Sequence, residues 1–123
     1  MAVTVADLIA RREEIKNKRK ELYDIEMSVG TLIVKPPTMK LLDDILKGQD
    51  NRQNDIELIF ETVVEPNFKD KDLQQAYGCE VPTDIVPMIF KPGEVSALAR
   101  AILRISGFGG NLEAKIHEEV KNS

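Results

Sequence analysis

Residues 64–78 read VEPNFKDKDLQQAYG and decide how the chain divides into helices. Pro66 cannot continue a helix and disfavours helical geometry in the residue before it, so a preceding helix is expected to end near residue 64. Asp70 is a favourable N-cap for a short helix, and Gly78 can adopt the left-handed conformation that ends it. We expect three side chains of this short helix to turn inward: Leu73, Ala76 and Tyr77.

On both sides of this stretch, apolar residues recur with the spacing of helices buried along one face. Upstream, the pattern predicts helices over about 38–48 and 50–64; downstream, it predicts a short helical piece over 84–90 and a longer helix over 92–106. Pro92 suits the first position of the longer helix, where its missing N–H costs nothing. The side chains expected to face the core are Met39, Leu42, Ile45, Leu46, Ile56, Ile59, Phe60, Val63, Val95, Leu98, Ala99, Ile102 and Ile105.

The N-terminal part of the sequence predicts a charged helix followed by a β-hairpin. Thr4 and Asp7 have the spacing of a capping box, and we expect the helix over residues 4–20. Apolar and polar residues then alternate, and the period changes to that of strands, which predicts a hairpin over residues 22–35. The second arm of this hairpin is apolar on both faces, so another part of the chain is expected to cover it.

These elements predict one domain over residues 1–123, of the mostly α (α+β) class, with five to six helices and one β-hairpin near the N-terminus. Residues 38–106 form the expected helical core. After the glycine-rich GFGG segment, Asn111 caps a last predicted helix over 111–121, which we expect to be able to swing.

Composition limits the classes of protein that the chain can belong to. The formal net charge is −4, yet residues 11–20 carry six basic and two acidic groups, which leaves −8 on the remainder. Cys79 is the only cysteine, so no intramolecular disulfide can form. No apolar run approaches the roughly 20 residues that a membrane-spanning helix needs, and no signal-peptide pattern is present. We therefore expect a soluble protein of a reducing compartment, with no membrane contact.

No group of residues predicts catalysis, a small-molecule substrate or a cofactor. The glycine-rich run at 107–111 lacks the preceding strand and the Lys-Ser or Lys-Thr pair of a phosphate loop. His117 is the only histidine, and one Cys and one His cannot supply a typical zinc site. The many carboxylates fall at helical spacing opposite apolar faces, as on a solvated helix surface. The chain is therefore predicted not to be an enzyme and to bind no cofactor or metal.

The basic N-terminal helix is the strongest candidate for contact with another molecule. Arg12, Lys16, Arg19 and Lys20 share one face of the predicted helix, which suits either an acidic protein partner or nucleic acid. Glutamates interleave with these residues, the whole chain is acidic and no DNA-reading motif is present, so a solvated or protein-contacting face is favoured.

An ordered set of short motifs resembles the tail assembly chaperones of tailed bacteriophages, in particular the XkdN-like group of phages and prophages of Gram-positive bacteria. The matching residues run from about 4 to 107 and are Pro37-Thr38; Val64, Pro66 and Asn67; Asp70, Leu73, Gln74, Ala76, Tyr77 and Gly78; Asp84–Val86; and Pro92–Val95. The resemblance implies a non-catalytic protein of the host bacterial cytoplasm that binds the phage tape measure protein, helps to recruit tail tube protein and is absent from the mature virion. It also implies that some relatives have a longer, frameshifted form.

Two groups of residues are therefore candidates for partner binding. The first is the apolar row of the last predicted helix, and the second is the basic face of the first: Leu112, Ile116 and Val120; Arg12, Lys16 and Arg19. The apolar row suits partner binding, packing against the rest of the domain, or self-association. Two other functions stay open, a small nucleic-acid-associated regulator that uses the basic helix and a structural tail component.

Overall fold

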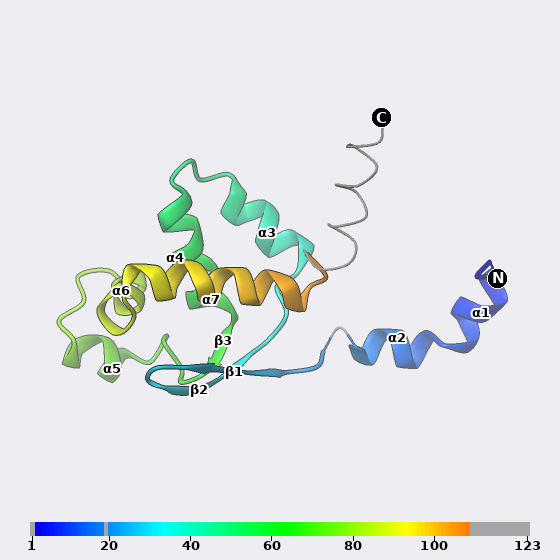
Figure 1. Ribbon diagram of the computed structural model, residues 1–123, viewed down its shortest axis with the longest axis horizontal. Coiled ribbons are helices and arrows are strands. Elements are labelled where there is room, and N and C mark those ends of the chain that lie inside the picture. The colour runs from blue at the N-terminus through cyan, green and yellow to red at the C-terminus, as the bar shows by residue number, and fades with distance from the viewer. Residues whose placement is uncertain (1, 19, 109–123) are drawn as a thin grey trace.

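The structure, a computed structural model, describes residues 2–18 and 20–108 (Figure 1). This part of the chain contains seven α-helices, one short 3₁₀ segment and a three-stranded sheet. In chain order they are α1 (Val5–Ala10), α2 (Arg12–Lys18), β1 (Tyr23–Met27), β2 (Gly30–Val34), α3 (Met39–Leu46), α4 (Asn51–Thr62), β3 (Val63–Glu65), α5 (Lys71–Ala76), η1 (Pro82–Asp84), α6 (Ile85–Ile89) and α7 (Pro92–Ile105). The predicted α+β class, mainly helical with a hairpin near the N-terminus, is confirmed.

Helices α4 and α7 pack together and form the centre of the core. The spacing of their apolar residues explains the packing, because every predicted core residue of α4 is buried and so are four of the five in α7. Ile105, at the end of α7, is only half-buried. The fully buried side chains of the two helices include Ile59 and Ile102, which have no measurable exposure. In Figure 1, α3 lies on one side of α7 and the sheet on the other, while α4 passes behind α7 and leads into β3.

The sheet contains a third strand that the sequence does not predict. β1 and β2 form the expected antiparallel hairpin, and β3 then pairs with β2 through Val34 and Val63. We expected Val64 to lie in the preceding helix, but α4 ends at Thr62 and the chain passes into β3 without a loop. The N–H of Lys35 donates to the carbonyl of Thr62 at 2.9 Å, which joins the end of β2 to this junction. β3 thus pairs along the edge of β2, and the core covers the second arm of the hairpin as expected, since Leu32 and Val34 are buried in it.

The predicted N-terminal helix is interrupted. Thr4 and Asp7 form the expected capping box at the start of α1, with distances of 3.0 and 3.1 Å between side chain and backbone. α1 ends at Ala10, however, and Arg11 separates it from α2, which ends at Lys18. The expected continuous helix over 4–20 is therefore wrong. No residue of either helix is buried, so tertiary packing does little to hold the two helices in line.

The stretch at 64–78 is anchored by a residue that periodicity does not reveal. Phe68 is only 1% exposed, and its ring meets that of Phe90 edge to face, with centroids 6.1 Å apart. Tyr77 and Ala76 were expected to turn inward, but Tyr77 is 49% exposed and Ala76 is also exposed. Leu73 is half-buried and packs against the core. The physical reason is that α5 is only six residues long, so most of its surface stays in solvent and Phe68 anchors the segment instead.

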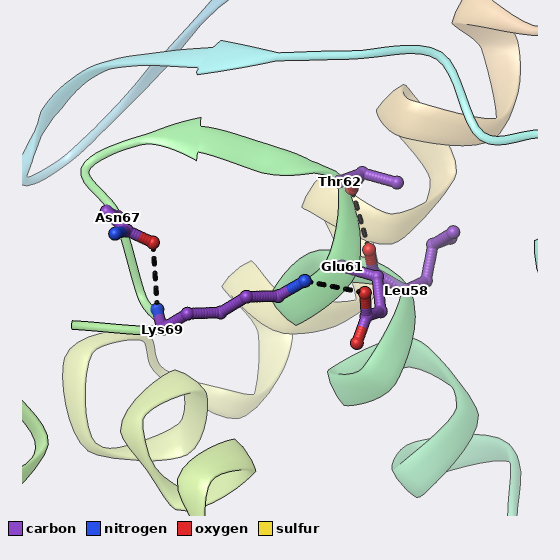
Figure 2. A network of polar contacts seen from close by, with 5 residues as sticks. All are labelled: Leu58, Glu61, Thr62, Asn67 and Lys69. Carbon is purple, nitrogen blue, oxygen red and sulfur yellow. Dashed lines mark hydrogen bonds and ion pairs between the residues drawn. The ribbon is translucent and has the colours of Figure 1, made fainter. Parts of the chain in front are cut away.

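Short-range polar contacts hold the same stretch against the end of α4 (Figure 2). The Lys69 ammonium lies 2.9 Å from a carboxylate oxygen of Glu61, and the Asn67 side-chain oxygen accepts from the backbone N–H of Lys69 at 3.1 Å. Inside the core, the buried hydroxyl of Thr62 donates to the carbonyl of Leu58 at 2.6 Å. An exposed ion pair contributes only about 0–1 kcal/mol, so these contacts fix the path of the chain more than they stabilise it.

Candidate partner-binding surface

Helix α3 presents apolar side chains on two sides. Thr38 caps it as predicted, by accepting from the N–H of Leu41 at 3.1 Å. The prediction placed four apolar residues on one buried face, but only Ile45 among them is buried, while Met39 is 74% and Leu46 is 70% exposed. Leu42, as predicted, and Leu41, which was not predicted, pack partly against the core. Met39 and Leu46 thus remain as exposed apolar side chains on α3.

The exposed Met39 borders an open pocket of about 350 Å³, which we call the α3–α7 groove. Its polar lining residues are Lys18, Thr38 and Ser106, and its apolar lining residues are Pro36, Pro37, Met39, Leu42, Ile105 and Phe108. The Ser106 hydroxyl donates to the carbonyl of Pro37 at 2.9 Å, which ties the end of α7 to the segment before α3. The lining of the groove is therefore mostly apolar, and this hydrogen bond joins the two segments that form it.

The backbone conformations of the segments before α3 and after α7 shape the groove. Pro36 and Pro37 separate β2 from α3 and hold their segment extended, since the residue before a proline avoids helical geometry. Gly107, with φ of +90°, ends α7 in a conformation that few other residues adopt, and Phe108 follows it against the groove with its side chain 51% exposed. The Pro-Pro pair and the exposed aromatic after a helix-ending glycine are the sequence signals that could have indicated the groove.

Two of the predicted basic contact residues lie on α2, which leads to the groove. Arg12 and Lys16 are exposed on α2, and the Arg12 guanidinium donates to the carbonyl of Ile9 at 3.0 Å, across the break between α1 and α2. Lys18, two residues after Lys16, lines the groove itself. The predicted contact residues outside the described part of the chain are Arg19, Leu112, Ile116 and Val120.

A second pocket, of about 470 Å³, lies between the start of α4 and the turn from α6 to α7. Its lining includes Arg52, Asp55, Pro87 and Phe90. Burial raises the pKa of the Asp55 carboxyl above its usual range, and the Arg100 guanidinium opposes this shift. One half-buried carboxylate beside two prolines is not a catalytic arrangement, since acid–base chemistry needs a second group placed against it.

The charge of Asp55 should make folding less favourable at neutral pH. A carboxyl with a raised folded-state pKa binds its proton more tightly in the folded protein, so its contribution to stability is lost as the pH rises from the unfolded value through the folded one. Asp55→Asn should therefore raise the melting temperature at pH 7, by an amount equivalent to about 0.5 kcal/mol. The difference from the parent should shrink below about pH 4.

Glu94 is the opposite case, because its pKa is lowered in the folded protein whereas that of Asp55 is raised. The Ser28 hydroxyl and the Lys91 N–H donate to its carboxylate and lower its pKa. Glu94→Gln should therefore lower the melting temperature at pH 7, and its difference should vanish as the pH falls through the lowered pKa. Melting curves from pH 3 to 8 check both; equal pH profiles for the two variants would contradict the assignment.

The described residues contain no grouping that points to metal or membrane chemistry. Across 2–18 and 20–108, no three His, Cys, Asp or Glu side chains converge as metal ligands would. None of the helices in these ranges is both long enough and apolar enough to cross a membrane. His117 lies outside these ranges, and Cys79 is half-buried with its sulfur 3.8 Å from that of Met88. We take the α3–α7 groove as the candidate site because exposed apolar side chains line it.

Comparison with known proteins connects this fold to phage tail assembly. The XkdN protein of the phage-like element PBSX of Bacillus subtilis (strain 168) is 27% identical over 127 aligned positions, which cover 89% of this chain and 85% of the relative. The uncharacterized protein YqbN of the same strain is 29% identical over 119 positions, which cover 84% of this chain and 79% of the relative. A crystal structure of YqbN shares the fold, with a TM-score of 0.60 and 24% identity over 72% of this chain and 87% of that one.

A match to a family model agrees with these relatives. The sequence model of the phage XkdN-like tail assembly chaperone proteins matches residues 13–121, which include α2 except for its first residue, Arg12, and every later element described above. The match confirms the resemblance carried by the motifs at 37–38, 64–78 and 92–95. α1 lies outside the matched residues. Because the match spans far more than half of the sequence, the chain belongs to the family of phage XkdN-like tail assembly chaperones.

Proposed function

We propose that this chaperone is non-catalytic, acts in the cytoplasm of the bacterial host and binds an apolar helical segment of the phage tape measure protein. In this way it keeps that protein soluble and helps to bring tail tube protein to it. The chaperone then leaves, so it is absent from the mature virion. The family supports a role in tail assembly with protein partners, and the partner surface described above supports the choice of an apolar segment.

The observation that carries the proposal is the α3–α7 groove with the exposed apolar side chain of Met39 in its lining. Amphipathic helices commonly bind proteins by laying their apolar face into a groove of this kind. Met39, Leu46 and Phe108 are each at least half exposed, although large apolar side chains gain by burial. A partner helix that covered them would gain this burial and would shield its own apolar face from other chains.

The six partner-binding candidates from the sequence lie close to residues of this groove along the chain. Arg12, Lys16 and Arg19 are within six positions of Lys18, which lines the groove. Leu112, Ile116 and Val120 follow Phe108, which also lines it, by four to twelve positions. We propose that both groups contact the partner, the basic group through acidic side chains of the tape measure protein and the apolar row through its apolar face.

A charge placed in the groove should weaken binding without unfolding the protein. Met39→Asp should weaken binding to the cognate tape measure protein at least about tenfold, as expected for a side chain at the centre of an interface. Met39 is mostly exposed, so the free energy of unfolding should change by no more than about 0.5 kcal/mol. Titration calorimetry with overlapping tape measure fragments, together with melting curves, measures both quantities.

Met88→Asp is the matched control. Met88 is likewise an exposed methionine on a short helix, at 47% against 74% for Met39, but it lies on α6 and does not line the groove. It should retain full binding. Equal affinities for both variants and the parent would refute the groove as the binding site, and no binding of any fragment by the parent would refute the proposed function.

The exposed basic face of α2 is the specific observation that favours the second candidate, a nucleic-acid-associated regulator. Such binding would fall steeply with salt and would be lost when Arg12 and Lys16 are replaced. A gel shift at low salt decides this point. Mass spectrometry of purified virions separates the chaperone from the third candidate, a structural tail component, because only a component of the tail would be found in the particles.

A further inference from the structure

On the described residues alone, the α3–α7 groove leaves apolar side chains in solvent. Met39 and Phe108, which both line it, are 74% and 51% exposed. Leu42 and Ile105, which also line it, are only half-buried. Each apolar side chain that is removed from water stabilises the protein that removes it. The free protein would therefore be stabilised by a further apolar segment that covers the groove.

The chain itself leaves α7 at this groove. The N–H of Gly107 donates to the carbonyl of Arg104 at 3.0 Å. The N–H of Phe108 donates to the carbonyl of Leu103 at 3.2 Å. With the positive φ of Gly107, these two bonds form a turn that commonly closes a helix and sets the path of the next residues. Phe108 lines the groove, so the residues that follow it start beside the apolar lining.

The sequence after Phe108 has a pattern that suits it as this cover. A glycine pair lets the chain reverse, and an asparagine is a favourable N-cap for the helix predicted over 111–121. Leu112, Ile116 and Val120 recur every four positions, so they form one narrow apolar row on that helix. These residues lie outside the described part of the chain. An isolated helix of this length is marginal in water, so the predicted helix needs a surface on which to bury its row.

The short connection favours this segment over any separate molecule as the occupant. Leu112 follows Phe108 by only four positions, so closing the loop between the groove and the row costs little chain entropy. A short flexible linker gives the attached segment an effective concentration in the millimolar range. A second copy of the chain at micromolar concentration would therefore compete poorly for the same groove.

We infer that, in the free chaperone, residues 111–121 dock into the α3–α7 groove of their own chain, with Leu112, Ile116 and Val120 turned toward its apolar lining. The docked segment covers Met39 until a partner takes its place, and the apolar row then becomes available for the contact proposed above. Docking in the free protein goes beyond tape measure binding and does not depend on it.

Hydrogen exchange in the full-length chain tests the docked segment directly. In the parent, the amides of 111–121 should exchange at least about tenfold more slowly than in a synthetic peptide of residues 109–123, because docking holds a helix that the isolated peptide barely forms. Ile116→Asp places a charge in the middle of the apolar row and should remove this protection. Mass spectrometry of peptic fragments measures the exchange.

Ala114→Asp is the matched control. It adds the same charge to the same predicted helix, about 160° around the helix from Ile116. Alanine is the best helix former, so this change costs the helix more intrinsic propensity than the replacement of Ile116 does. The control should nevertheless keep the protection. Equal loss in both variants would mean that the protection reports helix propensity rather than docking, and would overturn the inference.

A second pair of variants tests the groove as the docking site. Met39→Asp should also remove the protection at 111–121, although Met39 is far from that segment in sequence. Met88→Asp should retain it, because Met88 does not line the groove. Both side chains are exposed, so both variants should keep the circular dichroism spectrum of the parent.

Oxidation of the native methionines tests whether the cover comes from the same chain. Hydrogen peroxide converts an accessible methionine to its sulfoxide, and Ile116→Asp should speed this reaction at Met39 at least about threefold relative to the parent. Met88 serves as the internal reference and should react at an unchanged rate, since it lies outside the groove. In the parent, the rate at Met39 should be the same from about 5 to about 200 µM protein, because a contact within one chain does not depend on concentration.

Three further results would overturn the inference. They are rapid exchange of 111–121 in the parent, protection that survives Ile116→Asp or Met39→Asp, and cover of Met39 that appears only at high protein concentration, which would mean that a second copy occupies the groove. All of these measurements use the free protein. If the parent bound no tape measure fragment, the proposed function would fail and the docking of 111–121 would still stand or fall on its own results.

Discussion

Phe68→Ala should lower the free energy of unfolding by about 3–5 kcal/mol. The side chain is 1% exposed and meets the ring of Phe90 edge to face, so truncation removes both apolar burial and an aromatic contact and leaves a cavity. A domain of this size has a total stability of about 5–15 kcal/mol, so the loss is a large share. Urea denaturation followed by circular dichroism measures the change.

Tyr77→Ala is the control in the same stretch and should lower the free energy of unfolding by less than about 1 kcal/mol. Tyr77 is half exposed, so most of its ring is in water in both the folded and the unfolded chain. From the sequence, Tyr77 looked like the aromatic anchor of this stretch, and the two variants therefore decide between the two assignments. A larger loss for Tyr77→Ala than for Phe68→Ala would show that the packing described here is wrong.

The sequence predicts the long helices well because their signals repeat. In α4 and α7, several successive apolar residues fall on one face, and Pro92 and Glu94 mark the start of α7. Each additional residue of a helical pattern supports the same assignment. One predicted core residue that is only half-buried, such as Ile105, therefore does not change the assignment of the helix. The caps at Thr38 and Asp70 were also predictable, since Thr and Asp are favoured N-cap residues and each stands just before a predicted helix.

The sequence predicts short elements poorly because they carry too few residues for a pattern. β3 has three residues and follows α4 without a break, so its Val63 fits both a helix face and a strand. Phe68 stands alone among polar residues, and no period indicates that it turns inward. The direction of α5 depends on that anchor, which explains why the exposure of Tyr77 could not be read from the sequence.

The candidate surface was only partly predictable for a related reason. A groove is made by residues that are distant in sequence, here Pro36 and Met39 on one side and Ile105 and Phe108 on the other. The spacing of apolar residues in α3 suggested one buried face. A single sequence does not show which of these residues remain exposed once the helix is packed. The charge of α2, by contrast, was visible in the sequence and places Arg12 and Lys16 on an exposed face.

Leu98→Ala tests the centre of the core and should lower the free energy of unfolding by about 3 kcal/mol, within the range of 2–5 kcal/mol for buried leucines. Leu98 is 1% exposed on α7, the helix that packs most extensively on α4. The close packing around it leaves little room for neighbours to collapse into the space. Because α4 leads directly into β3, loosening this contact should also weaken hydrogen-exchange protection at the junction of Thr62 and Lys35.

Leu46→Ala is the chemically identical control and should change the free energy of unfolding by no more than about 0.5 kcal/mol. Leu46 is 70% exposed at the end of α3, and alanine is a slightly better helix former than leucine, so folding loses almost nothing. Such an exposed apolar residue on α3 is consistent with the proposed contact with another chain. If Leu46→Ala were as destabilising as Leu98→Ala, α3 would bury both of its apolar sides within the fold, and the partner surface argued here would not exist.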